Sequence, residues 1–599
     1  MSKFILTNSK EKLEIGLSNF LKRGLKVSGR FSLSGVYFIS FHKRGYDDEN
    51  IVFFENNFVC SIGTFIYQGR QGSSALNLLY NNFSDNFKEI QLESVLQGTI
   101  IIKKGSDIHV FCDKYNVHWT YYSKDKESFY ISSSLSNVVE SLDKKILLMD
   151  RFLEAKIQRG SMGNEMFYKG IKRLFGNQEI NINTKGEFYL KQYDYEQNRP
   201  DLSGASESEI IKFFSEAYFS VLENLVNAFN GEIAIHQSGG LDSRLILAGF
   251  LHLGYKPKLI YGLGNTPLTS QYNQGKIIID KICKKYALNS YLMNWSINGN
   301  MDVSQIVKSF HRYGFNCNEN YCNENWYKEY LENIGLHAKL LLDGHMGETL
   351  NIEGEDKIFN GIYPEVFSMD YLFEMYQNIF FTNFIWRSND RKKSHIDYLK
   401  SELSQLTDSV FKLPHSGDSM SIKDYQSFWW LRYRPADAHP TNLFNEFFSS
   451  LSPLGISKLH DITLNIPFNL IKNRGLSIKL IDSWVPGLND VGLFSRATRS
   501  RIKDGKIIRS GGRAQEVLMN LHRITPNSVV NAYRMGKNLV QKQNKVAIDP
   551  LRDFYVSQLK YSPLNEIFDF TNQKGDVRAL ATAFVYWKSI EVLGYDSIE

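Results

Sequence analysis

The chain has 599 residues, of which 43% are hydrophobic and 14% aromatic, enough to build several domains with large cores. Its 70 basic and 64 acidic residues are interspersed and leave a net charge of +6, which gives no support to nucleic-acid binding. No apolar run approaches the roughly 20 residues that span a bilayer. The N-terminus also lacks a signal-peptide core, so we expect a cytoplasmic protein without membrane insertion.

The cysteines are Cys60, Cys112, Cys283, Cys317 and Cys322, an odd and scattered set that indicates reduced thiols. Cys317 and Cys322 are close in sequence, but no second cysteine pair and no nearby histidine pair accompanies them. A zinc site is therefore not expected.

Short β-rich runs with polar or glycine breaks fill the chain from Phe31 to about Ile182. Examples are residues 35–41, 99–102 and 108–111. Their spacing predicts an antiparallel layered domain, whose fold we expect to begin near Phe31. The polar stretch at 197–208 predicts a linker.

Helices and strands alternate after this linker. Apolar residues at helical spacing predict a helix over 209–229. The next predicted elements are a strand at 232–236, a helix at 241–253, a strand at 258–262, a helix at 274–286 and a short buried strand at 340–342. This alternation predicts a parallel α/β sheet. The remainder is predicted to be mostly helical.

The turn between the strand at 232–236 and the following helix reads Ser-Gly-Gly-Leu-Asp-Ser, residues 238–243. Two glycines let backbone N–H groups approach an anion, and a helix N-terminus favours negative charge. Asp242 would repel bare phosphates, so its presence indicates a bridging Mg²⁺. The turn matches neither a Walker loop nor the dinucleotide fingerprint. It predicts a site for the pyrophosphate part of a nucleotide.

The same six residues are the signature of the PP-loop ATP pyrophosphatases, and their form most resembles the asparagine synthetase family. The resemblance implies an enzyme that adenylates a carboxylate, releases pyrophosphate and lets an amine attack. It implies an α/β fold with an N-terminal antiparallel β-rich domain of the Ntn type, αββα-like, at residues 1–196. A linker at 197–208 then leads to a parallel-sheet PP-loop synthetase domain at 209–599 with a helical C-terminal part.

Residues 344–348, Gly-His-Met-Gly-Glu, fit the frame of the family's second motif. Glu348 stands where the family usually has an aspartate that binds Mg²⁺ and pyrophosphate. His345 stands where asparagine synthetases have glutamate and β-lactam synthetases have tyrosine; the lasso peptide cyclases are similar to this chain in having histidine. A neutral imidazole there is a candidate base for the attacking amine.

The family also places in this region a lysine that stabilises the tetrahedral intermediate or the leaving pyrophosphate, and Lys479 and Lys503 are the two candidates for it. By analogy, Gly262 at the end of the second strand contacts adenine. The resemblance therefore implies catalytic residues among His345, Lys479 and Lys503; nucleotide contacts at Ser238, Gly239, Gly240, Leu241, Asp242, Ser243, Gly262 and Gly344; and Mg²⁺ ligands at Asp242 and Glu348. The implied cofactors are ATP and Mg²⁺.

The N-terminal domain departs from the family at its first residues. A working glutaminase of this family has a cysteine directly after the initiator Met, and this chain has Ser2. Cys60 and Cys112 fall inside predicted strands, where we interpret them as core thiols. We predict an inactive glutaminase domain, so the amine does not come from glutamine.

The predicted function is that of an ATP-dependent, AMP-forming carbon–nitrogen ligase. Its partners would be a small-molecule or peptide carboxylate and an amine, which is free ammonia, part of a second substrate, or part of the same substrate in a cyclisation. One alternative is amidation of a sugar or metabolite acid in surface polysaccharide synthesis. Another is a non-catalytic pseudoenzyme or binding protein of the same fold. Delivery of the substrate by the N-terminal domain and assembly into a homo-oligomer are left open.

Overall fold

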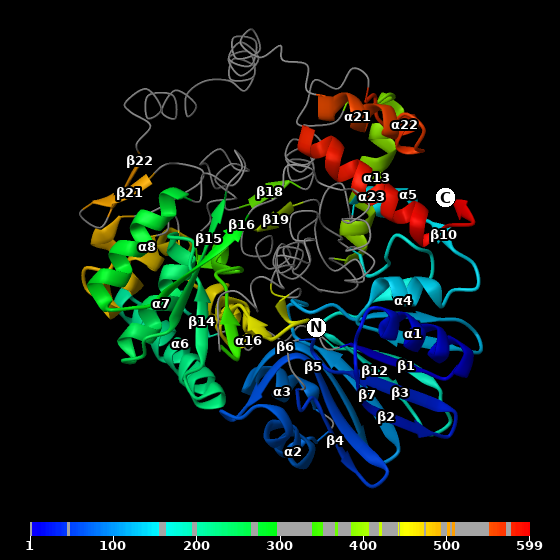
Figure 1. The fold of residues 1–599 in the computed structure, drawn as a ribbon, viewed down its shortest axis with the longest axis horizontal. Helices are drawn as coiled ribbons and strands as arrows, with labels where there is room; N and C mark the ends of the chain where they lie inside the picture. The colour runs from blue at the N-terminus through cyan, green and yellow to red at the C-terminus, as the bar shows by residue number, and fades with distance from the viewer. Residues whose placement is uncertain are drawn as a thin grey trace.

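The computed structural model combines two antiparallel sheets with one parallel sheet (Figure 1). The structure describes residues 3–44, 48–84, 86–154, 163–193, 200–264, 273–295, 338–350, 366–368, 385–406, 419–421, 441, 444–471, 475–492, 500–503, 506–509, 550–570 and 577–599.

The N-terminal part is a sandwich of two six-stranded sheets. The first has the order β11 (Ile171–Arg173), β8 (Tyr121–Lys124), β9 (Phe129–Ser132), β1 (Phe4–Thr7), β3 (Val36–Phe41), β2 (Val27–Leu33). The second has the order β13 (Phe188–Gln192), β12 (Gln178–Ile182), β7 (Asp107–Cys112), β6 (Ser94–Lys104), β5 (Asn57–Tyr67), β4 (Ile51–Phe54). The strand pairs within both sheets are antiparallel, which confirms the antiparallel layers predicted from the sequence.

Side-chain alternation along the strands creates four layers. Phe4 and Leu6 of β1 face the other sheet, where they join one core with Val110 of β7. Ile5 points the other way, against the helices α1 (Lys10–Lys22) and α4 (Leu135–Glu140). The outer face of the second sheet is covered by α2 (Gly72–Asn82) and α3 (Phe87–Glu93).

The expectation that the fold begins near Phe31 is wrong. β1 is an interior strand, paired on one side with β3 and on the other with β9, and α1 packs on it. Its four residues are too few to show an alternation pattern, and its partner β9 lies more than a hundred residues along the chain. The strand forms because it pairs with distant strands, and the alternation of apolar residues in its own short sequence could not predict it.

The helix α6 (Glu207–Phe229) follows the sandwich and confirms the helix predicted at 209–229. Ser206 caps its first turn and Glu209 reaches back to the Ser206 backbone, a capping box that contributes on the order of 1 kcal/mol. The helix ends at Asn230 in the left-handed conformation, followed by Gly231 at φ +71°. Residues 194–199, which include the start of the predicted linker, lie outside the described residues.

The parallel sheet has five strands in the order β16 (Ser290–Trp295), β15 (Lys258–Gly264), β14 (Ile233–His236), β17 (Leu340–Leu342), β20 (Ser449–Leu451). Every neighbouring pair is parallel, as predicted. β16 and β20 were not foreseen. The predicted helices at 241–253 and 274–286 are confirmed as α7 (Leu241–His252) and α8 (Asn273–Tyr286).

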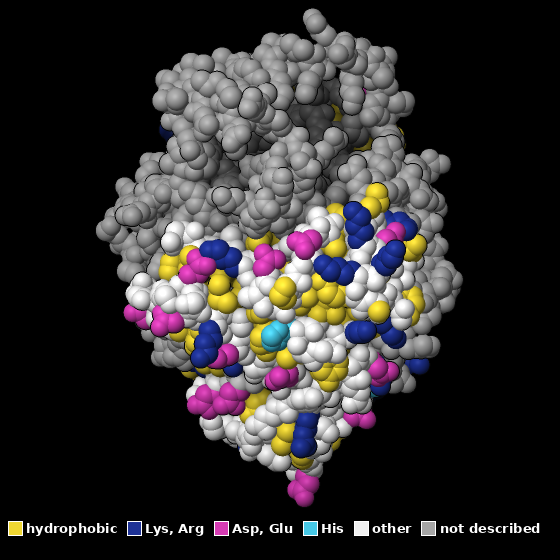
Figure 2. Space-filling model, turned by 90° about the vertical axis from the view of Figure 1, so that its left-hand side faces the viewer, with side chains coloured by type: hydrophobic (Ala, Val, Ile, Leu, Met, Phe, Trp, Pro, Cys, Tyr) yellow, Lys and Arg dark blue, Asp and Glu magenta, His cyan; other side chains and the backbone are white. Residues whose placement is uncertain are grey.

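Further helices complete this part of the chain. They are η4 (Gly347–Leu350), η8 (Pro453–Gly455), α16 (Ser457–Thr463), α17 (Phe468–Ile471), α18 (Gly475–Trp484) and η10 (Asn489–Val491). Figure 2 shows the face that forms the left-hand side of Figure 1, where acidic and basic side chains are interspersed among scattered apolar ones.

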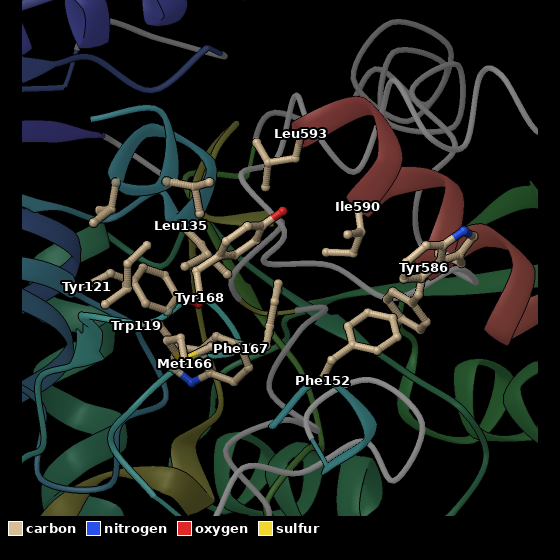
Figure 3. Close-up of a cluster of buried hydrophobic side chains, with 14 of the residues drawn as sticks. Trp119, Tyr121, Leu135, Phe152, Met166, Phe167, Tyr168, Tyr586, Ile590 and Leu593 are labelled. Carbon is tan, nitrogen blue, oxygen red and sulfur yellow. The ribbon is translucent and has the colours of Figure 1, made fainter. Parts of the chain in front are cut away.

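The C-terminal helices return to the N-terminal sandwich. They are α13 (Asn389–Leu406), α21 (Pro550–Leu559), α22 (Leu564–Ile567) and α23 (Val577–Leu593). In Figure 3 Tyr586, Ile590 and Leu593 of α23 gather with Phe152 and Tyr168 in one buried cluster. Beside it, β23 (Ser597–Ile598) pairs with β10 (Ile146–Leu147), next to α5 (Met149–Phe152).

Two further antiparallel strand pairs, each a separate two-stranded sheet, were not expected from the sequence. They are β18 (Val366–Ser368) with β19 (Ser419–Ser421) and β21 (Ser500–Lys503) with β22 (Lys506–Arg509). Among the described helices, none has the length and apolar character that a membrane span requires.

Candidate functional site

The turn between β14 and α7 presents hydrogen-bond donors at a helix N-terminus. Gly239 has φ +80°, a conformation that favours glycine. Gly240 is the N-cap and has no side chain to occupy the first-turn amides of α7. Ser243 Oγ accepts from the Ser238 backbone at 3.2 Å, and its oxygen also lies 3.2 Å from Ser238 Oγ. The turn thus has the geometry of an anion-binding helix start.

The segment after β17 packs directly against this turn. A Cβ added to Gly347 would stand 2.6 Å from both Cβ and Cγ of Asp242. A Cβ added to Gly344 would stand 2.9 Å from the Ser243 backbone nitrogen. Only glycines permit this approach. The two segments predicted from the sequence are therefore brought together, with the Asp242 side chain between them.

The position of both segments in the sheet favours ligand binding. From β14 the chain passes to β15 and β16 on one side, then to β17 and β20 on the other. The strand order therefore reverses between β14 and β17, and both segments leave the carboxyl ends of these two strands. Open α/β sheets bind ligands at such a switch point.

His345 is paired with a buried carboxylate that the sequence analysis did not single out. Its Nδ1 lies 2.9 Å from Asp343 Oδ1, and its backbone N–H donates to the same oxygen at 3.0 Å. The Thr441 hydroxyl donates to Asp343 Oδ2. Although burial raises the pKa of Asp343, His345 and these hydrogen bonds lower it below its ordinary value. A carboxylate at this place favours the proton on Nδ1, so Nε2 carries the basic lone pair.

Met346 adopts a conformation that is rare for its residue type. Its φ is +65° and its side chain is fully buried. It packs beside Gly455, where an added Cβ would stand 3.0 Å from Met346 Cγ. A left-handed conformation of a bulky non-glycine residue costs energy and persists only where the surrounding packing holds it. Such residues are often found at functional sites.

Arg244, the residue after the predicted loop, is a second residue that sequence reasoning missed. It is fully buried, and its guanidinium donates to Gly239 O at 3.2 Å, to Gly492 O at 2.5 Å and to Asn489 Oδ1 at 3.3 Å. Burial lowers its pKa to about 10, while Asp482 opposes the shift. The guanidinium therefore stays charged near neutral pH and ties the glycine turn to the segment at 489–492.

The other predicted nucleotide contacts lie around the same edge. Leu241 begins α7 with its side chain in the core, so only its backbone faces the turn. Gly262 lies in β15, opposite Met293 of β16. The second predicted Mg²⁺ ligand, Glu348, is the second residue of η4, and its side chain lies outside the described residues.

Among the described residues, no three His, Cys, Asp or Glu side chains lie close enough together to form a metal site.

The two candidate lysines lie elsewhere in the described structure. Lys479 is on α18, half exposed, with Nζ 2.5 Å from Glu207 Oε1 at the start of α6. The contacts described for it do not connect it to Asp242. Lys503 is the last residue of β21, opposite Lys506, and its side chain lies outside the described residues.

The two strand cysteines are core thiols, as predicted. Cys60 and Cys112 are fully buried, and burial raises the pKa of both well above the ordinary value. Ser2, Cys317 and Cys322 lie outside the described residues.

Comparisons with known proteins identify no family for the chain. No protein-family model matches it, and no curated protein matches it. Two solved structures that it resembles are the allosteric regulatory enzyme of purine biosynthesis (9% identity, 57% of this chain and 74% of that one, TM-score 0.23) and the glutamine phosphoribosylpyrophosphate amidotransferase from B. subtilis complexed with ADP and GMP (12% identity, 58% and 77%, TM-score 0.23). At these TM-scores neither similarity bears on the activity of this chain.

Proposed function

We propose that the protein is an ATP-dependent amide-forming ligase of the PP-loop synthetase type. It adenylates a carboxylate, releases pyrophosphate and transfers the acyl group to an amine that does not come from glutamine. The observation that carries the proposal is the contact of Asp242 with Gly344 and Gly347 at the switch point between β14 and β17. Two separate glycine segments and one carboxylate converge where a parallel sheet binds its ligand.

The residues of this edge suit the phosphates of ATP. The backbone amides at the start of α7 and the hydroxyls of Ser238 and Ser243 are donors for anionic oxygens. Asp242 is an acceptor only, so a cation would have to offset its negative charge when phosphates bind beside it. Mg²⁺, which is usually held by one or two carboxylates and substrate phosphates, would supply charge neutralisation there, with Asp242 and Glu348 as its ligands.

His345 supplies the base for the second half of the reaction. Asp343 orients the imidazole through Nδ1, which leaves Nε2 to take the proton from the attacking amine. The side chain of His345 is 30% exposed, so a substrate can reach it, whereas Asp343 is 1% exposed. In this pair, His345 exchanges the proton with the substrate, and Asp343 fixes the orientation of the imidazole.

The four-layer sandwich supports the assignment of an Ntn-type domain that has lost glutaminase chemistry. Helices cover the outer faces of two packed antiparallel sheets. Ser2 replaces the cysteine nucleophile of the family. Cys60 and Cys112 cannot replace it, because both are buried and burial disfavours their thiolates. The nitrogen then comes from ammonia, from a second substrate or from the substrate itself.

The nucleotide product tests the proposal. The full chain is incubated with Mg²⁺ and ATP labelled on the α phosphate, together with fractions of a cell extract as the source of acid and amine. We expect labelled AMP to form with an equal amount of pyrophosphate and of a new amide, and AMP formation to fall by about 10²-fold or more with Asp242→Asn. Label recovered only as ADP, or AMP formed equally by the variant, rejects the proposal.

A further inference from the structure

β20 is an edge strand of the parallel sheet, yet its outward backbone groups are satisfied. On its inner side β20 pairs with β17, and within the part of the chain that the structure describes no other strand lies beyond it. Ser450 and Ser452 direct their backbone groups outward, toward the sandwich. An edge of this kind is usually paired, covered or solvated, because unmade backbone hydrogen bonds are costly when buried.

Side chains take the place of a sixth strand, and two of them, Thr64 and Gln97, belong to the sandwich. Thr64 and Gln97 face each other in the β5–β6 ladder. At Ser450, Asn445 is a partner together with Thr64: Asn445 Nδ2 donates to Ser450 O at 2.6 Å and Asn445 Oδ1 accepts from the Ser450 N–H at 3.1 Å. Thr64 Oγ1 accepts from the same N–H at 3.1 Å and lies 3.0 Å from Ser450 O. Gln97 Nε2 donates to Ser452 O and Gln97 Oε1 accepts from the Ser452 N–H, both at 2.8 Å. The Gln97 amide thus reproduces the donor and acceptor of a peptide group.

The Gln97 contact continues into the second glycine segment. The Ser452 hydroxyl donates to the backbone oxygen of His345. Gln97 Nε2 also lies close to Gly455: a Cβ added to this glycine would stand 2.9 Å from Gln97 Nε2 and 3.0 Å from Met346 Cγ. Gln97 itself is fully buried. A chain of hydrogen bonds therefore runs from a sandwich strand through Ser452 to the turn that faces Asp242.

We infer that Gln97 is a positioning residue for the nucleotide site. It holds Ser452, and through Ser452 the segment 343–347, in the place that Asp242 and Mg²⁺-ATP require. This inference rests on the proposed function. It gives the N-terminal domain a present role, because that domain covers an edge of the parallel sheet next to the segment that contacts Asp242.

The test uses the full chain with Gln97→Met, Gln97→Glu and the control Gln91→Met. Gln91 is also a buried glutamine of the sandwich, but it donates to Cys112 O and Gly176 O within its own domain. Two quantities are measured at pH 6 and pH 8. The first is the Kd of the protein, in the presence of Mg²⁺, for α,β-methylene-ATP, an analogue that cannot be cleaved between its α and β phosphates. The second is the amide hydrogen exchange rate of residues 343–347.

We expect Gln97→Met to weaken nucleotide binding about tenfold at both pH values and to speed exchange at 343–347, since two buried backbone groups lose their partners. Gln97→Glu should bind nearly as wild type at pH 6 and more weakly at pH 8. A protonated carboxyl both donates and accepts, whereas a carboxylate only accepts. Gln91→Met should leave both quantities within twofold of wild type.

A Kd of Gln97→Met within twofold of wild type overturns the inference. Two other results overturn it as well: an equal loss of nucleotide affinity in Gln91→Met, and a loss of affinity in Gln97→Glu that is the same at pH 6 and pH 8. The proposed function fails separately, if the wild-type protein does not bind the nucleotide at all. In that case hydrogen exchange still decides the positioning role, because unchanged protection of 343–347 in Gln97→Met would contradict it.

Discussion

The side chain of Asp242 lies against Gly347, so that a methyl group on the glycine would stand 2.6 Å from Cβ and Cγ of the aspartate. The near end of the aspartate side chain cannot move away without moving α7. The contact fixes the distance between the loop after β14 and the turn after β17. The carboxylate of Asp242 is thereby held where both segments meet.

Gly347→Ala tests this contact. The added methyl must displace Asp242, so we expect binding of Mg²⁺ with α,β-methylene-ATP, measured by calorimetry, to weaken at least tenfold. Gly204→Ala is the matched control, because Gly204 has nothing within 4 Å of its Cβ position. Equal affinities for the two variants would show that the contact does not shape the site.

Arg244→Lys tests the tie between the glycine turn and residues 489–492. A lysine cannot bridge Gly239 O, Gly492 O and Asn489 Oδ1 at once, because it lacks the planar fork of the guanidinium. We expect the thermal midpoint to fall, the free energy of unfolding to decrease by roughly 1–3 kcal/mol, and nucleotide binding to weaken. Lys212→Met on the exposed face of α6 should change neither. A normal affinity in Arg244→Lys would leave Arg244 with a purely structural role.

His345→Gln separates the two halves of the proposed reaction. Glutamine keeps a hydrogen-bonding side chain but cannot accept the proton of the amine. We expect nucleotide binding and carboxylate-dependent pyrophosphate exchange to persist, and amide formation to fall by about 10²-fold or more. The measurement compares exchange with amide product in the same preparation. Loss of both in parallel would contradict a role confined to the amine step.

Lys43 gives a pH prediction for the contact between the sandwich and the parallel sheet. Its Nζ lies 3.2 Å from Ser449 Oγ and 3.4 Å from Asn445 Oδ1. Burial lowers the pKa of Lys43 from 10.5 to about 8, with Asp48 opposing the shift. Between these pH values the unfolded chain holds a proton that the folded chain has released, so this residue makes stability rise with pH.

Lys43→Met removes that titration. The stability of wild type relative to Lys43→Met should therefore increase by about 3 kcal/mol from pH 8 to pH 10.5. Denaturant unfolding of both proteins across this range measures the difference. A constant difference would mean that Lys43 keeps an ordinary pKa in the folded protein.

Local pattern was sufficient for part of the fold. α6, α7 and β15 were predicted because their periodicity and caps lie within one stretch of chain. β20 was missed, since Ser449-Ser450-Leu451 has little strand character of its own and is held by β17 and by the sandwich. Its place depends on residues far away in sequence, such as Gln97.

The candidate site shows the same division. The residues of the loop 238–243 and of the turn 344–347 were predicted from their types and spacing, and the structure brings them together. Asp343 could have been noticed, because this carboxylate directly follows the predicted strand at 340–342 and stands two residues before His345. Arg244 gave no signal: an arginine in the first turn of a helix usually faces solvent, and only the fold buries this one.

Pyrophosphate exchange tests the central claim most directly. The full chain is mixed with ATP, Mg²⁺, labelled pyrophosphate and fractions of carboxylates, and the label that enters ATP is counted. We predict carboxylate-dependent exchange in the wild-type protein and in Gly204→Ala, and a fall of about 10²-fold or more in Asp242→Asn, which keeps the shape of the side chain but removes its charge. Exchange at the same rate in Asp242→Asn would contradict the account.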